Sequence, residues 1–359
     1  MNYLDHVDKK VIEYFNILEP KFPKWLNEYI NTKEMLKQQY ISVTCGTIYS
    51  DLFKNYCYSS LDHSIAVALI IWHFTHDKKQ TLSGLFHDIA TPAFKHCIDF
   101  LNGDYMTQES TEDLTSEIIK KSNEIMTLLK RDNIDIKEGE NYRLYPIADN
   151  DTPKLSADRL EYSLSNALIT YKIEELDKIR NIYNDINIQK NEEGIDELGF
   201  ESESIAKSFV EMTSKLSIIY MEDRTRYSMQ FIVDILKKLN NEGKIKREDL
   251  YVLKETEIID IIENSKYKEV FTKWKTAKQI LTSETPPKNV YFVHHGAKIR
   301  YIDPLVNGER IAKINKKAQK LINNNLSYNM NKNIYTLTLI SNKKQLKQKI
   351  VLKTYQYYF

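Results

Sequence analysis

Two histidines and an aspartate, His87, Asp88 and His96, lie in the largely apolar stretch GLFHDIATPAFKHCIDF, which spans residues 84–100. His87 and Asp88 are adjacent, and His96 follows four residues after Pro92. Imidazole nitrogens and carboxylate oxygens are ligands that borderline divalent metal ions accept in proteins. Taken alone, the stretch is compatible both with a metal site and with a helix end that carries polar side chains.

Histidine is concentrated in one part of the chain, since five of the eight histidines fall between residues 63 and 96. His63 lies in SSLDHSIAVALIIWHF, an apolar run that predicts a buried helix. Ser60 or Asp62 is expected to cap this helix, which would place His63 in its first turn.

Two further predicted helices carry the remaining candidate ligands. His87 and Asp88 end the apolar segment LSGLFHDIA, which Pro92 terminates. Asp158 lies in KLSADRLEYSLSNAL, a helix for which Ser156 is a suitable cap. Three such helix turns, packed in a bundle, can direct two imidazoles and two carboxylates at one point. This mixed ligand set suits Mn, Fe, Ni or Zn, with Mg also possible.

Each of these residues has a simpler interpretation when it is considered singly. His87 alone is also compatible with a histidine of the hydrophobic core. His73 and His76 suit the negative end of a helix. The order His63, His87-Asp88, Asp158, with a helix predicted at each position, is what favours a metal site.

The predicted elements define a mainly α fold with a smaller α+β C-terminal portion. Apolar residues recur at three- and four-residue spacing over about 5–280, and the acidic segment NIQKNEEGIDELG is expected to be a loop. Beyond SETPPK, two β-branched and aromatic stretches predict strands on either side of one helix, ERIAKINKKAQKLINNNL. We therefore expect a helical region over 1–240 and an α+β region over 241–359.

Composition excludes several classes of protein. With 359 residues, 42% hydrophobic and 28% charged, the sequence is typical of a folded soluble protein. The longest apolar run, IAVALIIWHF, is about half the roughly 18 residues needed to span a membrane. Three cysteines without C-x-x-C spacing indicate neither a disulfide framework nor a zinc ribbon. A cytoplasmic location is expected.

Charge is distributed unevenly along the chain. From Glu284 onward the sequence has 14 Lys and Arg against 3 Asp and Glu, whereas the residues before it carry 37 basic against 47 acidic groups. The basic region is compatible with packing on the acidic part, with binding to phosphates or nucleic acid, and with a solvated lysine-rich face.

The three sequence blocks resemble the HD-domain metal-dependent phosphohydrolases, and among them the deoxynucleoside triphosphate triphosphohydrolases. The blocks are DHSIAVALI, LFHDIATPAFKH and ADRLEYS, in the order typical of the family, within roughly residues 40–170. The resemblance implies an HD-domain helical bundle with one divalent metal ion. It implies as ligands His63, His87, Asp88 and Asp158.

The same resemblance implies roles for residues beyond the ligands. His96 would face the phosphates or the attacking water, and Glu109 would orient His96 or activate that water. Arg159 would contact a phosphate and Tyr162 would stack on a sugar. A first-turn helix carboxylate is the alternative for Glu109, and a surface ion pair is the alternative for Arg159.

The sequence departs from the triphosphohydrolases at two positions. Ser60 stands where the family has an arginine, and Gln108 stands where it has a catalytic histidine. Glutamine transfers no protons, so removal of one phosphate or cleavage of a diester fits the residues better than triphosphate release. Near the C-terminus, Lys298 and Arg300 are two residues apart, which would place both on one strand face, directed at an anion.

The sequence therefore predicts a metal-dependent phosphohydrolase acting on a nucleotide or related phosphate ester: a phosphomonoester, a phosphodiester or a dNTP. Two alternatives remain open. One is a nucleotide-binding regulator with reduced catalysis; the other is a nucleic-acid phosphodiesterase or binder that uses the basic C-terminal region. By resemblance and base rate, a homo-oligomer is expected.

Overall fold

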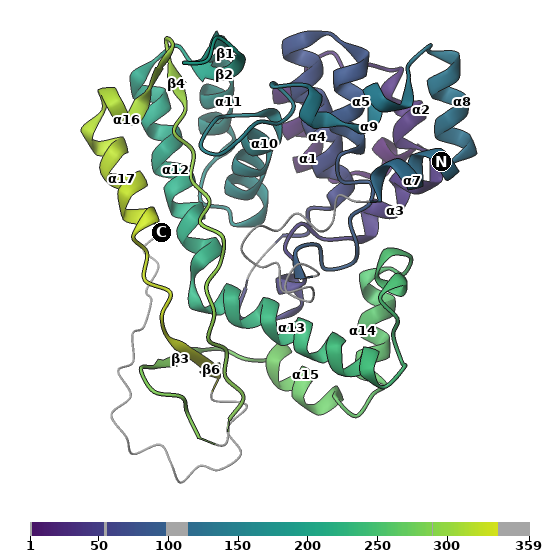
Figure 1. Cartoon of the computed structure of the whole chain (residues 1–359), viewed down its shortest axis with the longest axis vertical. Coiled ribbons are helices and arrows are strands. Elements are labelled where there is room, and N and C mark those ends of the chain that lie inside the picture. The colour runs from purple at the N-terminus through teal and green to yellow at the C-terminus, as the bar shows by residue number, and fades with distance from the viewer. Residues whose placement is uncertain (1, 54–55, 98–113, 289, 337–359) are drawn as a thin grey trace.

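The protein is mainly α-helical, with two small sheets in and beside its C-terminal part, as the sequence predicts (Figure 1). The computed structural model describes residues 2–53, 56–97, 114–288 and 290–336. The helices before residue 145 are η1 (Tyr3–His6), α1 (Lys9–Leu18), α2 (Leu26–Ile30), α3 (Lys33–Lys37), η2 (Gln38–Tyr40), η3 (Thr47–Tyr49), α4 (Ser60–Thr75), α5 (Lys78–Phe86), α7 (Thr115–Lys121), α8 (Asn123–Arg131), α9 (Ile136–Glu140) and η4 (Tyr142–Leu144). Those after it are α10 (Ala157–Ser165), η5 (Asn166–Thr170), α11 (Leu176–Asn184), α12 (Glu203–Met221), α13 (Asp223–Asn241), η6 (Glu248–Tyr251), α14 (Glu255–Glu263), α15 (Lys268–Lys275), α16 (Ile311–Ile314) and α17 (Lys316–Leu326).

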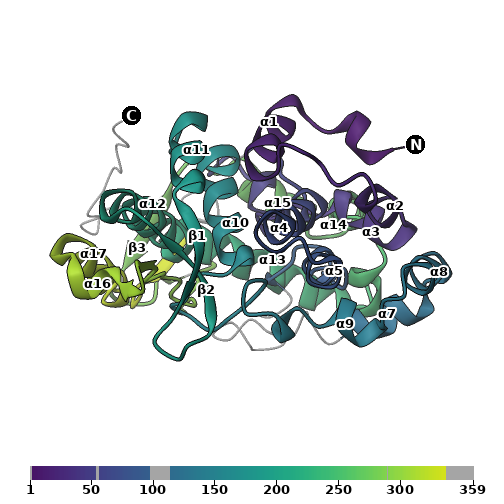
Figure 2. The ribbon, with the colours of Figure 1, turned by 90° about the horizontal axis from the view of Figure 1, so that it is seen from above.

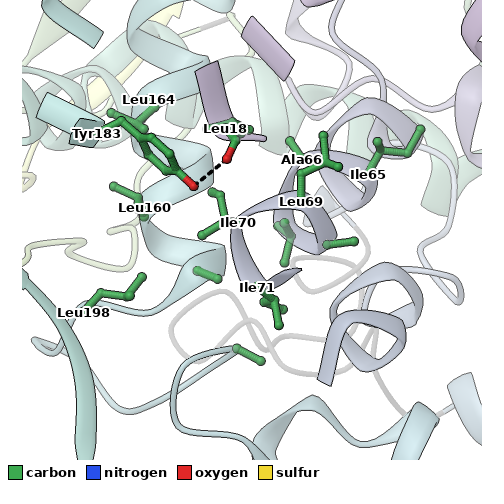
Figure 3. Close-up of a cluster of buried hydrophobic side chains, with 14 of the residues drawn as sticks. Leu18, Ile65, Ala66, Leu69, Ile70, Ile71, Leu160, Leu164, Tyr183 and Leu198 are labelled. Atoms are coloured by element: carbon green, nitrogen blue, oxygen red, sulfur yellow. Dashed lines mark hydrogen bonds between the residues drawn. The ribbon is translucent and has the colours of Figure 1, made fainter. Parts of the chain in front are cut away.

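Helix α4 forms the centre of the main core. Its side chains from Ile65 to Ile71 are almost fully buried, and α1, α5 and α10 pack around it. Figure 3 shows this cluster, with Tyr183 donating a 2.9 Å hydrogen bond to the carbonyl of Leu18 at its edge. The cap of α4 is Ser59, in a capping box with Asp62, and Ser60 is the first helical residue. The sequence predicted Ser60 or Asp62 as the cap, whereas the cap is Ser59, one residue before Ser60.

Helix α10 forms where the sequence predicted it. The Ser156 side chain accepts a hydrogen bond from the amide of Arg159, which confirms Ser156 as the cap. The helix continues directly into η5, a π-helical turn, and π turns interrupt helices most often near functional sites. Side chains of Asn166–Thr170 therefore point in directions that differ from those of a regular α-helix.

The acidic segment expected to be a loop is instead a β-hairpin. Strand β1 (Ile186–Lys190) pairs antiparallel with β2 (Asp196–Phe200), and Gly194 forms the turn with a φ of 74°. Strand β2 also pairs in parallel with β4 (Leu305–Val306), which pairs with β5 (Glu309–Arg310). A sheet partner more than 100 residues away stabilises strands that local composition does not favour.

Among the described residues of the first predicted C-terminal strand segment, only Leu305–Val306 forms a strand, and most of the second segment lies outside the described residues. Residues 294–304 belong to no strand, so Lys298 and Arg300 do not share a strand face. Strand β3 (Ile280–Ser283) pairs with β6 (Asn333–Thr336). The single predicted helix is divided in two at Asn315, whose side chain caps α17.

Buried apolar side chains form two clusters. The first contains α1, α4, α5 and α10–α12, together with residues 302–322. The second contains residues 227–274 with Phe94, Val293 and Ile334. Figures 1 and 2 show α17 beside α12, on the side away from α5. Each cluster contains residues from both sides of residue 240. The predicted domain boundary stays a prediction.

Part of the basic C-terminal region packs on the acidic part of the chain. Arg310 is buried and forms ion pairs with Glu197, at 2.6 Å, and with Glu192, at 2.8 Å, on the β1–β2 hairpin. Within the described part of the chain, no helix combines the length and apolarity needed to cross a membrane.

Candidate metal centre

His63 is held in one orientation by a buried carboxylate. The residue lies in the first turn of α4, and its Nδ1 atom is hydrogen-bonded to Glu161 of α10. Glu161 is fully buried and also accepts hydrogen bonds from the hydroxyls of Tyr58, at 2.8 Å, and Ser165, at 3.3 Å. The ring is therefore fixed from behind, and its Nε2 atom is directed at the other candidate ligands.

His87 immediately follows α5 and is fixed in a similar way. Its Nδ1 atom lies 2.6 Å from the carbonyl oxygen of Gly84, and its Nε2 atom lies 3.2 Å from His63 Nε2. Because a carbonyl only accepts, this contact assigns a proton to Nδ1 and directs Nε2 at the other candidate ligands. Tyr142 covers the ring of His87, with the two centroids 5.5 Å apart.

Two aspartates complete the group. Asp158 Oδ1 lies 3.2 Å from His63 Nε2 and 3.7 Å from His87 Nε2. Asp88 approaches His63 Nε2 at 3.9 Å and His87 Nε2 at 3.8 Å. The structure thus brings together all four residues predicted as metal ligands. Ligand atoms of His63, His87 and Asp88 all lie within 4.8 Å of one another and could hold a metal ion.

The charges of the group favour a bound cation. Burial disfavours a charged imidazole, but Glu161 and Asp158 outweigh burial and raise the pKa of His63 to about 10. Burial opposes the charge on Asp158 too, yet the two imidazoles hold its pKa below the ordinary value. A proton on His63 and a divalent ion would satisfy the same negative potential, so metal binding must displace this proton.

A lysine that sequence reasoning did not single out also enters the group. Lys95 is buried, and its Nζ atom lies 2.5 Å from Asp88 Oδ2 and 3.3 Å from Ser60 Oγ. Burial opposes both charges, but each residue stabilises the other. The pKa of Lys95 is raised and that of Asp88 is held well below its ordinary value.

The group opens into a cavity of about 610 Å³, which is within the usual range for small-molecule sites. The predicted site residues that line it are His63, His87, Asp88, His96, Asp158, Arg159, Tyr162, Lys298 and Arg300. The structure therefore gathers the predicted ligands, His96 and the predicted substrate-binding residues around one space. Glu109 and Gln108 lie outside the described residues.

The predicted phosphate and sugar contacts have definite partners in this cavity. The Arg159 guanidinium donates to the side chain of Asn150 at 2.7 Å and lies 3.4 Å from Asp149 Oδ1. This places Arg159 in an ion pair inside the cavity and not on the surface. The Arg300 guanidinium lies over the ring of Tyr162, 5.8 Å from its centroid, although no strand carries it.

Sequence reasoning missed three residues of this site. Glu161 follows Asp158 by three positions in ADRLEYS, so helical spacing alone places both carboxylates on one face. Lys95 directly precedes His96, but sequence gives no sign that its ammonium turns inward. Tyr142 lies in an irregular segment, and no local pattern connects it with His87.

Two proteins that resemble this chain have names that describe no function. No protein-family model matches the chain. The chain is 26% identical over 261 residues to the uncharacterized protein YdhJ of Bacillus subtilis (strain 168), covering 68% of this chain and 73% of that protein. Its structure is similar to a hypothetical protein from Aquifex aeolicus, with a TM-score of 0.61, 18% identity, and coverage of 88% of this chain and 93% of that one. The structural likeness shows a shared fold.

Proposed function

We propose that this protein is a metal-dependent phosphohydrolase of the HD-domain type, acting on a nucleotide or related phosphate ester. The observation that carries the proposal is the approach of His63 Nε2 to His87 Nε2, with the carboxylates of Asp88 and Asp158 beside them. Two nitrogens and two carboxylates suit one divalent ion such as Mn, Fe, Ni or Zn, with Mg as a further candidate. Such an ion would lower the pKa of a water molecule and neutralise charge on phosphoryl oxygens.

The cavity next to this group suits a substrate with both phosphate and ring components. Positive charge comes from Lys95, Lys298 and Arg300, and aromatic surface comes from Tyr162 and Tyr220. Cationic side chains bind phosphate oxygens and aromatic rings stack on bases or sugars. A nucleotide combines both requirements.

In the proposed reaction, a bond forms between a water oxygen and phosphorus while the bond from phosphorus to the ester oxygen breaks. One proton leaves the water and one proton ends on the leaving oxygen. His96 lines the cavity and is the described residue that we assign to proton transfer. Glu109 keeps its proposed role of orienting His96 or activating the water.

A nucleotide-binding regulator with reduced catalysis is the second candidate. Arg159 favours it, because the guanidinium proposed to contact phosphate is already engaged by Asn150 and Asp149. Thermal-shift measurements separate the two functions: a regulator is stabilised by nucleotides with several metals and forms no product.

Nucleic-acid binding by the basic region is the third candidate. It requires affinity for single strands that falls steeply with salt. The cytoplasmic location and the homo-oligomer stay predictions.

The test of the main proposal combines metal content with turnover. We expect purified protein to contain about one divalent metal ion per chain and to hydrolyse members of a phosphate-ester panel. The double variant His87→Ala/Asp88→Ala should lose both properties. His73→Ala is the matched control, since His73 pairs with Glu19 at 3.1 Å outside the cavity. Wild-type turnover by the metal-free double variant would reject the proposal.

A further inference from the structure

The backbone around Lys95 adopts an unusual conformation. Phe94 and Lys95 have φ values of 64° and 44°, the left-handed region that disfavours residues with a β-carbon. Non-glycine residues persist there when their surroundings fix them, and such positions cluster at functional sites. Two consecutive residues of this kind sit at the edge of the metal centre.

Contacts on both sides hold this turn in place. The amide of Phe94 donates a 3.1 Å hydrogen bond to the buried Glu255 carboxylate, and the amide of Ala93 donates to the carbonyl of Leu250 at 2.8 Å. The Phe94 ring is fully buried in the second hydrophobic cluster. Because the Phe94 ring is anchored in the second hydrophobic cluster, the turn directs the Lys95 side chain the opposite way, toward the metal centre.

The Lys95 ammonium reaches the same carboxylate that is a candidate metal ligand. It contacts Asp88 Oδ2 at 2.5 Å and Ser60 Oγ at 3.3 Å, and Ser60 Oγ is itself 3.3 Å from Asp88 Oδ2. Ser60 is the first residue of α4, and its short side chain leaves the space that the ammonium occupies. A buried ammonium is costly unless an anion compensates it.

Once a divalent ion is bound, Asp88 would contact both that ion and the Lys95 ammonium. Lys95 also lines the cavity in which we propose that substrate binds, so a phosphate oxygen there would give its ammonium a second anionic partner. We infer that Lys95 is a phosphate-binding residue of this site, contacting a substrate phosphoryl oxygen beside Asp88. This inference deepens the proposed function and rests on it for the identity of the substrate class.

The test measures metal and phosphate binding separately from turnover. Metal affinity is titrated for wild type, Lys95→Met, Lys95→Arg and Lys95→Gly, and tripolyphosphate binding to the Mn-loaded proteins is then measured by calorimetry. Lys95→Gly is included because glycine adopts a φ of 44° without strain, so it keeps the turn if Lys95→Met fails to fold. Lys79→Met is the matched control, because Lys79 pairs with Glu138 at 2.7 Å outside the cavity.

Loss of one charge-assisted contact should weaken tripolyphosphate binding by roughly tenfold or more in Lys95→Met and Lys95→Gly. We expect Lys95→Arg and Lys79→Met to bind as wild type within a few-fold, and metal affinity to be kept in all variants. Because Ser60 Oγ contacts the ammonium, Ser60→Lys combined with Lys95→Gly should recover part of the binding.

Two results would overturn the inference. The first is equal tripolyphosphate binding by wild type and Lys95→Gly, or no binding by either. The second is loss of the metal ion from the Lys95 variants, which would show that Lys95 only supports Asp88. Turnover distinguishes this from failure of the proposed function. If the wild type binds tripolyphosphate through Lys95 but hydrolyses no ester, the inference stands and the phosphohydrolase proposal fails.

Discussion

The Nε2 atoms of His63 and His87 face each other at 3.2 Å, while Glu161 and the Gly84 carbonyl hold the two Nδ1 atoms from behind. Two imidazole lone pairs at this separation repel each other unless a proton or a cation lies between or beside them. The nearby carboxylates of Asp88 and Asp158 add negative charge, which further stabilises a cation at this position. The centre is therefore organised for a cation by groups that are not themselves candidate ligands.

The contact between His63 and Glu161 gives the first prediction. Glu161→Gln removes the carboxylate that orients His63, and partners of this kind typically change metal affinity by roughly 10- to 100-fold. We expect a loss in that range, measured by competition with a chelating dye.

Glu197→Gln is the control for this variant. Glu197 is equally buried and pairs with Arg310 away from His63. It should lower stability and leave metal affinity intact. Equal metal affinity in both variants and in wild type would show that Glu161 does not support the centre.

The second prediction concerns pH and the anchor of the Lys95 turn. Burial raises the pKa of Glu255 from 4.5 to about 7, despite its hydrogen bonds from Phe94, Tyr49 and Ser42. Between these two values the folded protein holds a proton that the unfolded chain releases. The free energy of unfolding should therefore fall as pH rises from about 4.5 to 7, by an amount on the order of 3 kcal/mol.

Glu255→Gln removes this contribution because its side chain does not ionise. Urea unfolding of both proteins at pH 5 and pH 8 measures it, and the difference between them cancels the other titrating groups. We expect the variant to gain stability relative to wild type on going to pH 8. Parallel pH profiles would contradict the assignment.

The third prediction addresses how residues 295–300 are held at the cavity. Arg226 is buried in α13, and its guanidinium donates to the carbonyls of His295, Met330 and Met221. Lysine has the charge but not the planar set of donors, so Arg226→Lys should lose some of these bonds.

We expect faster amide hydrogen exchange in residues 295–300 and weaker tripolyphosphate binding, with metal affinity unchanged. Arg310→Lys is the comparison, because Arg310 is also buried but pairs with the β1–β2 hairpin. If Arg226→Lys changes neither exchange nor phosphate binding, residues 295–300 are held in place by other contacts.

The fourth prediction tests the packing that positions His87. A β-carbon at Gly84 would lie 2.2 Å from Ile71 Cδ1 and 3.2 Å from Val67 Cγ1, both on α4. Gly84→Ala should therefore push α5 away from α4 and destabilise the protein by roughly 1–3 kcal/mol.

A second helical glycine provides the control. A β-carbon at Gly139 meets nothing closer than 3.6 Å, so Gly139→Ala should be neutral or slightly stabilising by denaturant unfolding. A neutral Gly84→Ala would show that α4 and α5 are not closely packed at this point.

The sequence allowed the four candidate ligands to be predicted because each lies in or beside a helix with strong apolar periodicity. Ser156 caps α10 as predicted, and this cap places Asp158 in the first turn of the helix. The β1–β2 hairpin was missed because its segment is acidic, and its second strand pairs with Leu305–Val306, which no local pattern reveals. Non-local pairing of this kind is what makes strands harder to predict than helices.

Lys95 illustrates a different limit. Its position next to His96 was visible, but its direction depends on positive φ values that Glu255, more than 150 residues away, helps to hold. Lys298 and Arg300 reached the cavity although the strand predicted to carry them does not form. Residue types and order were thus sufficient to predict the candidate ligands, whereas the positions of the cations that line the cavity depend on tertiary contacts.

The central claim is that His63, His87, Asp88 and Asp158 bind one divalent metal ion. Anomalous diffraction from crystals of the purified protein, recorded across the Mn, Fe, Ni and Zn absorption edges, tests it most directly. We predict a single strong peak within bonding distance of His63 Nε2, His87 Nε2 and both carboxylates. No peak between these four side chains, in crystals grown with any of these metals, would contradict the claim.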